Sequence, residues 1–253
     1  MDENKMTQTG ERLLTVDNLK TTFMIHKTKV EAVRGASIHV DDGDILAVVG
    51  ESGSGKSVLM KSIMGLLPEN AQTTADSLVY MGSNLLEFSA DERRKMRGKE
   101  FAMIFQDPMT SLNPVSTVGD QILEVLNLHF PDMTKEEKDR RVDEMMQMVG
   151  IPAARKHEYP HQFSGGMKQR IVIAMALVAE PELLLADEPT TALDVTIQAQ
   201  ILELMKQLKE KFNSAMILIT HDLGVVAEFC DNVAIVYAGE VIEYGSVEEI
   251  YAR

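Results

Sequence analysis

The sequence predicts an α/β fold with an N-terminal antiparallel β region and an inserted α-helical subdomain. Residues 45–49 form a continuous apolar run, as in a buried strand, and residues 58–64 follow a glycine-rich loop with the apolar spacing of a helix. Residues 13–23 and 30–40 instead alternate apolar and polar side chains, which is typical of half-buried strands. From about residue 91 to 180, charged helical segments predominate.

The order of these patterns defines the expected domain organisation. The 253 residues fit one domain, 1–253, with an α/β core at 13–90 and 181–253 and a helical subdomain at 91–180. An acidic, glycine-containing turn at 41–44 leads into the buried strand. Three methionines of the helical region are expected to pack in its core: Met145, Met146 and Met148.

Composition excludes several classes of protein. Hydrophobic residues make up 45% of the chain, but no apolar run approaches the roughly eighteen residues of a membrane span. The net charge of −14 disfavours nucleic acid as a partner. The N-terminus has no signal-like apolar segment, and Cys230 is the only cysteine, so a reducing cytoplasm without an internal disulfide is expected.

A complete phosphate-binding pattern, G-x-x-x-x-G-K-[ST], follows the strand at 45–49. It consists of Gly50, Glu51, Ser52, Gly53, Ser54, Gly55, Lys56 and Ser57. Glycines let backbone N–H groups approach a triphosphate without a Cβ clash, and the next helix points its positive end at the anion. Lys56 is expected to reach the β- and γ-phosphates and Ser57 to ligate Mg²⁺. Val58 completes the predicted phosphate-binding stretch. The alternative is a simple strand-to-helix turn.

A second apolar strand, residues 183–187, ends in two carboxylates, Asp187 and Glu188. An aspartate at such a strand end can hold Mg²⁺ through its water shell, and the next glutamate can accept a proton from an attacking water. Any buried strand can end in acidic turn residues, but behind a complete phosphate loop the pair indicates an ATPase site.

The segment 163–170, FSGGMKQR, resembles the signature motif of ATP-binding cassette (ABC) ATPases. Phe163 and Met167 replace the first and last residues of the commonest form, L-S-G-G-Q, and in isolation the motif could be a glycine-rich helix cap. Four further positions are similar to family elements: Gln106 of the Q-loop, Asp194 of the D-loop, the switch histidine His221, and Phe23, which takes the place of the aromatic that stacks on adenine.

The resemblance implies a P-loop NTPase (RecA-like) core that binds ATP and Mg²⁺. Ser57, Gln106 and Asp187 would hold the metal, Glu188 would be the general base, and His221 would contact the γ-phosphate. Two subunits would enclose two ATP molecules, each completed by the other subunit's signature motif. The residues carried over for that contact are Ser164, Gly165, Gly166 and Met167, with Asp194 nearby in the D-loop.

Three segments, 106–114, 159–164 and 237–245, are similar to the oligopeptide/dipeptide importer branch of the family, which also includes nickel importers. This similarity implies a second ABC ATPase subunit, with a heterodimer expected, and two transmembrane permease subunits contacted by the Gln106 loop and residues 109–114. An extracellular or periplasmic binding protein would select the cargo. The chain would then lie peripherally on the cytoplasmic face of the membrane.

Two alternatives to peptide import remain at this point. One is an importer of nickel or another small solute. The other is a soluble non-transport ABC protein, but such proteins usually carry two cassettes or a long coiled coil, and neither is present. Members of the peptide branch usually continue into a cysteine-bearing tail that can hold an iron–sulfur cluster; with Cys230 alone we expect no cluster.

Overall fold

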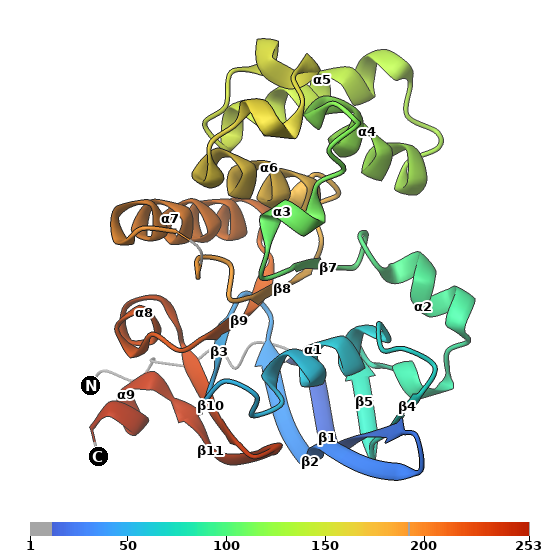
Figure 1. The fold of residues 1–253 in the computed structure, drawn as a ribbon, viewed down its shortest axis with the longest axis vertical. Coiled ribbons are helices and arrows are strands. Elements are labelled where there is room, and N and C mark those ends of the chain that lie inside the picture. Colours follow the sequence, from blue (N-terminus) through green and yellow to red (C-terminus); the bar gives the residue numbers. More distant parts are fainter. Residues whose placement is uncertain (1–11, 192, 253) are drawn as a thin grey trace, which may run out of the picture.

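The structure is a computed structural model that describes residues 12–191 and 193–252 (Figure 1). The N-terminal part is an antiparallel five-stranded sheet with the order β2-β1-β5-β6, in which β4 also pairs with β1. Its strands are β1 (Arg12–Ile25), β2 (Thr28–Asp41), β4 (Ala71–Thr74), β5 (Ser77–Tyr80) and β6 (Ser83–Asn84). The alternating segments 13–23 and 30–40 are the main part of β1 and β2, as predicted.

The second sheet has six strands in the order β11-β10-β3-β9-β8-β7. All neighbouring pairs are parallel except β10 and β11, which form a hairpin at one edge. Its strands are β3 (Ile45–Val49), β7 (Phe101–Ile104), β8 (Leu183–Asp187), β9 (Ala215–Thr220), β10 (Asn232–Tyr237) and β11 (Glu240–Ser246). The apolar run at 45–49 is therefore a central strand that is buried on both faces.

The helices are α1 (Lys56–Met64), α2 (Ala90–Met96), α3 (Pro108–Ser111), α4 (Val118–His129), α5 (Lys135–Met148), α6 (Gly165–Leu177), α7 (Val195–Phe212), α8 (Leu223–Phe229) and α9 (Val247–Tyr251), with short 3₁₀ turns at Leu85–Glu87, Ala153–His157 and Pro160–Gln162.

Alternate residues of the parallel sheet pack into different cores. Along β8, Leu183 and Leu185 pack with α1 and the antiparallel sheet, whereas Leu184 and Ala186 pack with α4 to α7.

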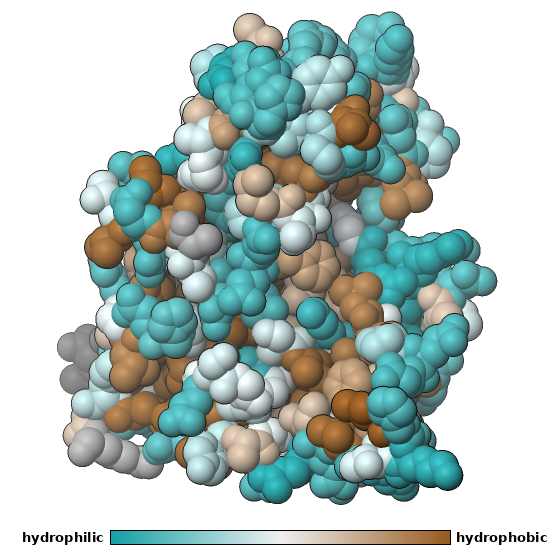
Figure 2. All heavy atoms as spheres, viewed as in Figure 1, coloured by the Kyte–Doolittle hydropathy of each residue, from teal (hydrophilic) through white to brown (hydrophobic). Residues whose placement is uncertain are grey.

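The helical part lies above the sheets in Figure 1 and consists of α3 to α6. Side-chain caps start its longer helices: Thr117, Thr134 and Ser164 each accept a hydrogen bond from a backbone N–H in the first turn. Met145 and Met146 are fully buried, which confirms their predicted place in the core. Hydrophilic residues cover most of this part in the view of Figure 2.

The helical range expected at 91–180 also contains β7, a strand of the six-stranded sheet. β7 pairs in parallel with β8, and its Ile104 is fully buried. The strand has only four residues, so its pairing partner, rather than a periodic pattern of its own, specifies it. None of the described helices combines the length and apolar character that a membrane crossing requires.

Candidate active site

The phosphate loop connects β3 to α1 and packs closely against neighbouring backbone. A Cβ at Gly50 would lie 2.1 Å from the carbonyl oxygen of Val236, and one at Gly55 would lie 2.5 Å from that of Ala32. Gly55 also has a φ of 103°, a conformation that favours glycine. Both positions therefore require glycine for steric reasons.

Lys56 is held across the loop that it follows. Its Nζ donates hydrogen bonds of 2.8 Å to the carbonyl oxygens of Gly50 and Glu51, and its side chain is buried. Ser54 Oγ, in the same loop, is buried and has no hydrogen-bond partner among the described residues. A buried hydroxyl without a partner is costly, so the loop is suited to a ligand that supplies one.

Two of the three metal residues predicted from sequence, Ser57 and Asp187, meet beside the end of β8, whereas Gln106 is hydrogen-bonded to Glu188. Because β9 is the only strand between β3 and β8, the phosphate loop and Asp187 lie at the same edge of the sheet. Ser57 Oγ donates a hydrogen bond of 2.8 Å to Asp187 Oδ1. Burial raises the pKa of Asp187 above its ordinary value, while the bond from Ser57 and the charges of Lys61 and Lys56 act against that rise.

The side chain of Glu188 is contacted by three other side chains. Its Oε2 accepts hydrogen bonds from Gln106 Nε2 at 3.1 Å and from Thr191 Oγ1 at 2.8 Å, and His221 Nδ1 lies 3.8 Å from the same oxygen. Its backbone N–H donates to the carbonyl oxygen of Ile219 in β9. Its φ of 45° is unusual for a residue with a side chain, and strained conformations of this kind concentrate at functional sites.

The contact of Thr191 with Glu188 is one that sequence reasoning missed. The only signal was its position three residues after Glu188, at the start of the segment that resembles a D-loop. Glu188 and Thr191 also line a pocket of about 540 Å³. The other residues around this pocket are Thr190, Gln198, Thr220, His221, Asp222, Leu223 and Gly224.

Other predicted residues lie apart from this group. Ser164 begins α6, where its Oγ accepts a hydrogen bond from Met167 N, and Asp194 caps α7 through Ile197 N. Among the described residues, no hydrogen bond links 164–167 to the phosphate loop. Phe23 is half-buried near the end of β1, where it pairs with Val30 and Ala71.

The donor set fits a magnesium ion that shares its shell with phosphate. Within 12–191 and 193–252, no group of three or more histidine, cysteine, aspartate or glutamate side chains is arranged as a metal cage. Mg²⁺ in nucleotide sites is commonly held by one or two protein oxygens, substrate phosphates and waters. Ser57 Oγ and Asp187 Oδ1 at the end of the phosphate loop match that arrangement.

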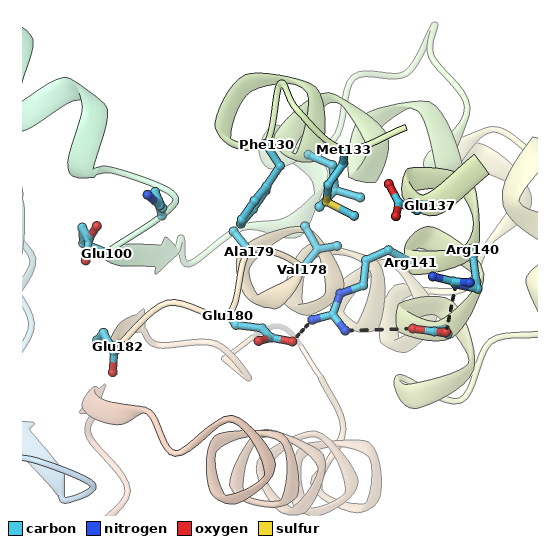
Figure 3. A pocket seen from close by; sticks show the side chains of 13 residues that line it. Glu100, Phe130, Met133, Glu137, Arg140, Arg141, Val178, Ala179, Glu180 and Glu182 are labelled. Carbon is cyan, nitrogen blue, oxygen red and sulfur yellow. Dashed lines mark hydrogen bonds and ion pairs between the residues drawn. The ribbon is translucent and has the colours of Figure 1, made fainter. Parts of the chain in front are cut away.

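A separate pocket of about 540 Å³ lies at the base of the helical part (Figure 3). Phe130, Met133 and Val178 form its apolar wall, and Arg141 pairs with Glu180 at its rim. None of the residues predicted to bind nucleotide or metal lines it. The candidate active site is therefore the edge of the parallel sheet that carries Lys56, Asp187 and Glu188.

Comparison with known proteins identifies the family. Residues 33–191 match the family model described as ABC transporter. The chain belongs to the ABC transporter family. As a member it binds and hydrolyses ATP as the ATPase subunit of a transporter. The family predicted from the signature motif and the phosphate loop is thereby confirmed.

Curated relatives of this ABC ATPase cover nearly the whole chain. It is 54% identical to the dipeptide transport ATP-binding protein DppD of Lactococcus lactis subsp. cremoris (strain MG1363), over 95% of this chain and 70% of the relative. It is 53% identical to the oligopeptide transport ATP-binding protein OppD of Bacillus subtilis (strain 168), over 95% and 68%. With OppD of Escherichia coli (strain K12) the identity is 48%, over 96% and 72%.

Solved structures of ABC ATPases confirm the fold class. A dimeric post-hydrolysis state of the ATP-binding cassette MJ0796 bound to ADP and Pi is 27% identical to this chain, with a TM-score of 0.79. It covers 92% of this chain, and the match covers 98% of the cassette. CbiO1 from Clostridium perfringens, part of the ABC transporter complex CbiONQ, is 27% identical with a TM-score of 0.80, over 96% of this chain and 92% of its own.

Proposed function

We propose that this ABC ATPase powers the import of oligopeptides or dipeptides. The observation that carries the substrate class is the identity of about half of all residues with curated dipeptide and oligopeptide transport ATP-binding proteins, over 94% or more of the chain. Three segments singled out in the sequence, 106–114, 159–164 and 237–245, support the same branch.

In the proposed ATP complex, the phosphate loop exchanges internal hydrogen bonds for bonds to the nucleotide. Lys56 Nζ leaves the carbonyl oxygens of Gly50 and Glu51 for the β- and γ-phosphates, and the loop amides surround the anion. Ser54 Oγ gains the partner that it lacks within the described chain. Phe23 stacks on the adenine.

Magnesium, when bound, neutralises charge on the β- and γ-phosphates. Ser57 Oγ and Asp187 are the residues of this chain that would hold it, with Gln106 reaching the site from the end of β7. Ser57 and Asp187 are already 2.8 Å apart through their mutual hydrogen bond.

Glu188 is the proposed general base. Within residues 12–191 and 193–252, the polar contacts of its side chain, from Gln106, Thr191 and His221, are all made to Oε2, so that Oε1 can face the attacking water. Deprotonation of that water by a positioned carboxylate is the step that the geometry supports. His221, which is 65% exposed at its side chain, is placed to turn towards the γ-phosphate.

A second ATPase subunit would complete each site. The signature residues 164–167 begin α6 at a distance from their own phosphate loop, whereas Val195, beside Asp194, is 83% exposed. These features suit an interface in which the signature motif of one subunit meets the phosphate loop of the other. We expect the partner to be a different ATPase chain.

A groove of about 1040 Å³ is the proposed docking site for the permease subunits. It runs between α1 and the helical part and includes Gln106 and Asp107, and the outline in Figure 2 is indented on the right, between the helical part and α2. Apolar side chains of Phe105 and Leu128 are 40% and 74% exposed there. Contacts at this groove would place the chain peripherally on the cytoplasmic face of the membrane.

The test is reconstitution of the chain with permease subunits and a partner ATPase subunit from the same organism. In proteoliposomes, ATP hydrolysis should rise with a peptide-loaded binding protein, and labelled peptide should accumulate. Leu128→Glu should reduce this stimulation while leaving ATP binding unchanged. The control is Met81→Glu, at an exposed site outside the groove. Accumulation of Ni²⁺ instead of peptide would overturn the substrate assignment, and no association with permease subunits would overturn the importer.

A further inference from the structure

The turn between β10 and β11 supports the phosphate loop from behind. Gly239 N donates a hydrogen bond of 2.8 Å to the carbonyl oxygen of Ser54. The carbonyl of Val236, two residues before the turn, lies against Gly50, and Gly239 Cα would lie 3.5 Å from a Cβ at Gly55. The end of β10 is thus in contact with the start of the loop, and the turn with its middle and end.

This turn has a conformation that needs outside support. Tyr237 pairs with Glu240, so Ala238 and Gly239 form a two-residue hairpin loop. Both have positive φ, 46° and 86°, as type I′ hairpin turns require. Glycine adopts such angles readily, whereas alanine at the first position is disfavoured.

Arg34 of β2 supplies that support through three contacts. Its backbone N–H donates to the carbonyl oxygen of Gly239 at 2.7 Å, and its Nε donates to that of Ala238 at 2.8 Å. Its Nη2 lies 3.5 Å from Glu240 Oε1. The planar guanidinium makes the last two contacts from two different nitrogens in a fixed geometry, which the single nitrogen of a lysine does not reproduce. Arg34 therefore joins the antiparallel sheet to the hairpin directly behind the phosphate loop.

We propose that Arg34 is a positioning residue for ATP binding. Its side chain fixes Ala238 in the strained half of the turn, the turn fixes Gly239, and Gly239 fixes the carbonyl of Ser54 in the loop. The loop amides are then already oriented when the triphosphate arrives, so less binding free energy is lost in ordering them. Arg34 acts on the phosphate-binding part of the site and has no role at the adenine.

The test compares the affinity of the purified chain for ATP and for inorganic tripolyphosphate by calorimetry. Arg34→Ala keeps the backbone bond to Gly239 and removes the side-chain contacts. Loss of the side-chain hydrogen bond from Arg34 to the carbonyl oxygen of Ala238 should weaken the binding of both ligands by about three- to tenfold. The matched control is Arg94→Ala, which removes an exposed arginine whose ion pair with Asp91 lies in α2. Glu240→Gln removes the charge partner alone and should have less than half of the effect.

A rescue variant separates positioning from a general loss of stability. Ala238→Gly relaxes the turn, so the side chain of Arg34 should no longer be needed to hold it. The double variant, Arg34→Ala with Ala238→Gly, should therefore bind tripolyphosphate with an affinity within about twofold of that of Ala238→Gly alone. Melting temperatures measured beside each titration show that the variants are folded; if Arg34→Ala does not fold, Arg34→Lys is judged by the same criteria. Unchanged tripolyphosphate affinity, weakening of ATP alone, or failure of the glycine rescue would overturn the proposal. Absence of ATP binding in the wild-type chain would instead contradict the ATPase assignment.

Discussion

Ser57 and Asp187 are 130 residues apart in the sequence, and Ser57 Oγ donates a hydrogen bond of 2.8 Å to Asp187 Oδ1. The bond joins the first turn of α1 to the end of β8. Ser57 is the donor in this bond, so the lone pairs of its oxygen remain available to a metal ion while its hydrogen stays directed at Asp187. The two residues are best examined with and without nucleotide.

Asp187→Asn should raise the melting temperature of the nucleotide-free chain near neutral pH. Burial raises the pKa of Asp187 in the folded state. The stability that protonated Asp187 contributes is therefore fully present at a pH below the pKa of Asp187 in the unfolded chain. It is lost as the pH rises through the raised pKa of Asp187 in the folded chain. Asparagine carries no charge to bury and can still accept the bond from Ser57.

Calorimetry between pH 5 and 8 checks this prediction. The difference in melting temperature between Asp187→Asn and wild type should shrink as the pH falls. Asp91→Asn, at a side chain that is 81% exposed, is the control and should show no such trend. A variant that melts below wild type at neutral pH would contradict the prediction. The same substitution should weaken ATP binding in the presence of Mg²⁺.

Lys56→Ala should raise the Kd for ATP by about 10- to 100-fold, since charge-assisted hydrogen bonds to the phosphates are lost. Calorimetric titration at fixed Mg²⁺ measures this change. Lys95→Ala, at an exposed position of α2, should bind ATP like the wild type. Equal affinities for Lys56→Ala and wild type, in a folded variant, would show that the phosphate loop is not the ATP site.

Glu188→Gln should separate ATP binding from hydrolysis. Glutamine keeps the shape and can still accept the hydrogen bond from Thr191, but it cannot take a proton from water. Single-turnover cleavage should fall by about 10²–10⁴-fold, as expected for loss of a general base, while ATP stays bound. The assay requires the partner subunit with its corresponding glutamate also replaced. Cleavage near the wild-type rate would exclude Glu188 as the base.

Phe23→Ala should weaken ATP by about fivefold, corresponding to the ~1 kcal/mol of a stacking contact. It should leave the affinity for inorganic tripolyphosphate unchanged, because the side chain is proposed to touch only the adenine. Titration with both ligands tests this. Equal weakening of both, or a large fall in melting temperature, would indicate that the half-buried Phe23 is a packing residue of β1.

The sequence was sufficient to predict the elements that have a strong local pattern. β1 and β2 alternate, β3 is a continuous apolar run, and α1 follows a complete phosphate-binding motif. By contrast, β4 is a polar segment of four residues, Ala71–Thr74, that becomes a strand by pairing with β1. β7 is specified in the same way by β8. Tertiary pairing, which no local pattern encodes, decides such short strands.

For the candidate site, the sequence predicted which residues take part but not how they contact one another. Motif chemistry named Lys56, Ser57, Asp187 and Glu188 without any knowledge of distances. It did not indicate that Lys56 is bonded to the loop carbonyls, or that Glu188 has a positive φ and gathers Gln106, Thr191 and His221. The contacts of Gln106 and His221 with Glu188 depend on segments that are distant in sequence and meet only at the edge of the folded sheet. The bonds of Lys56 and Thr191 are local, but they depend on a loop geometry that the motif does not specify.

The position of β3 between β9 and β10 bears on how the chain folds during synthesis. Val48 pairs with Ile219 on one side and with Ala234 on the other, so both neighbours of β3 are translated long after β3 itself. The β1–β2 hairpin can close early, because its strands adjoin in sequence. Until residues 215–237 leave the ribosome, however, the five apolar residues of β3 have no strand on either side. The loop that binds ATP is therefore translated well before the strands that flank β3, and ATP binding reports that these strands have joined the sheet.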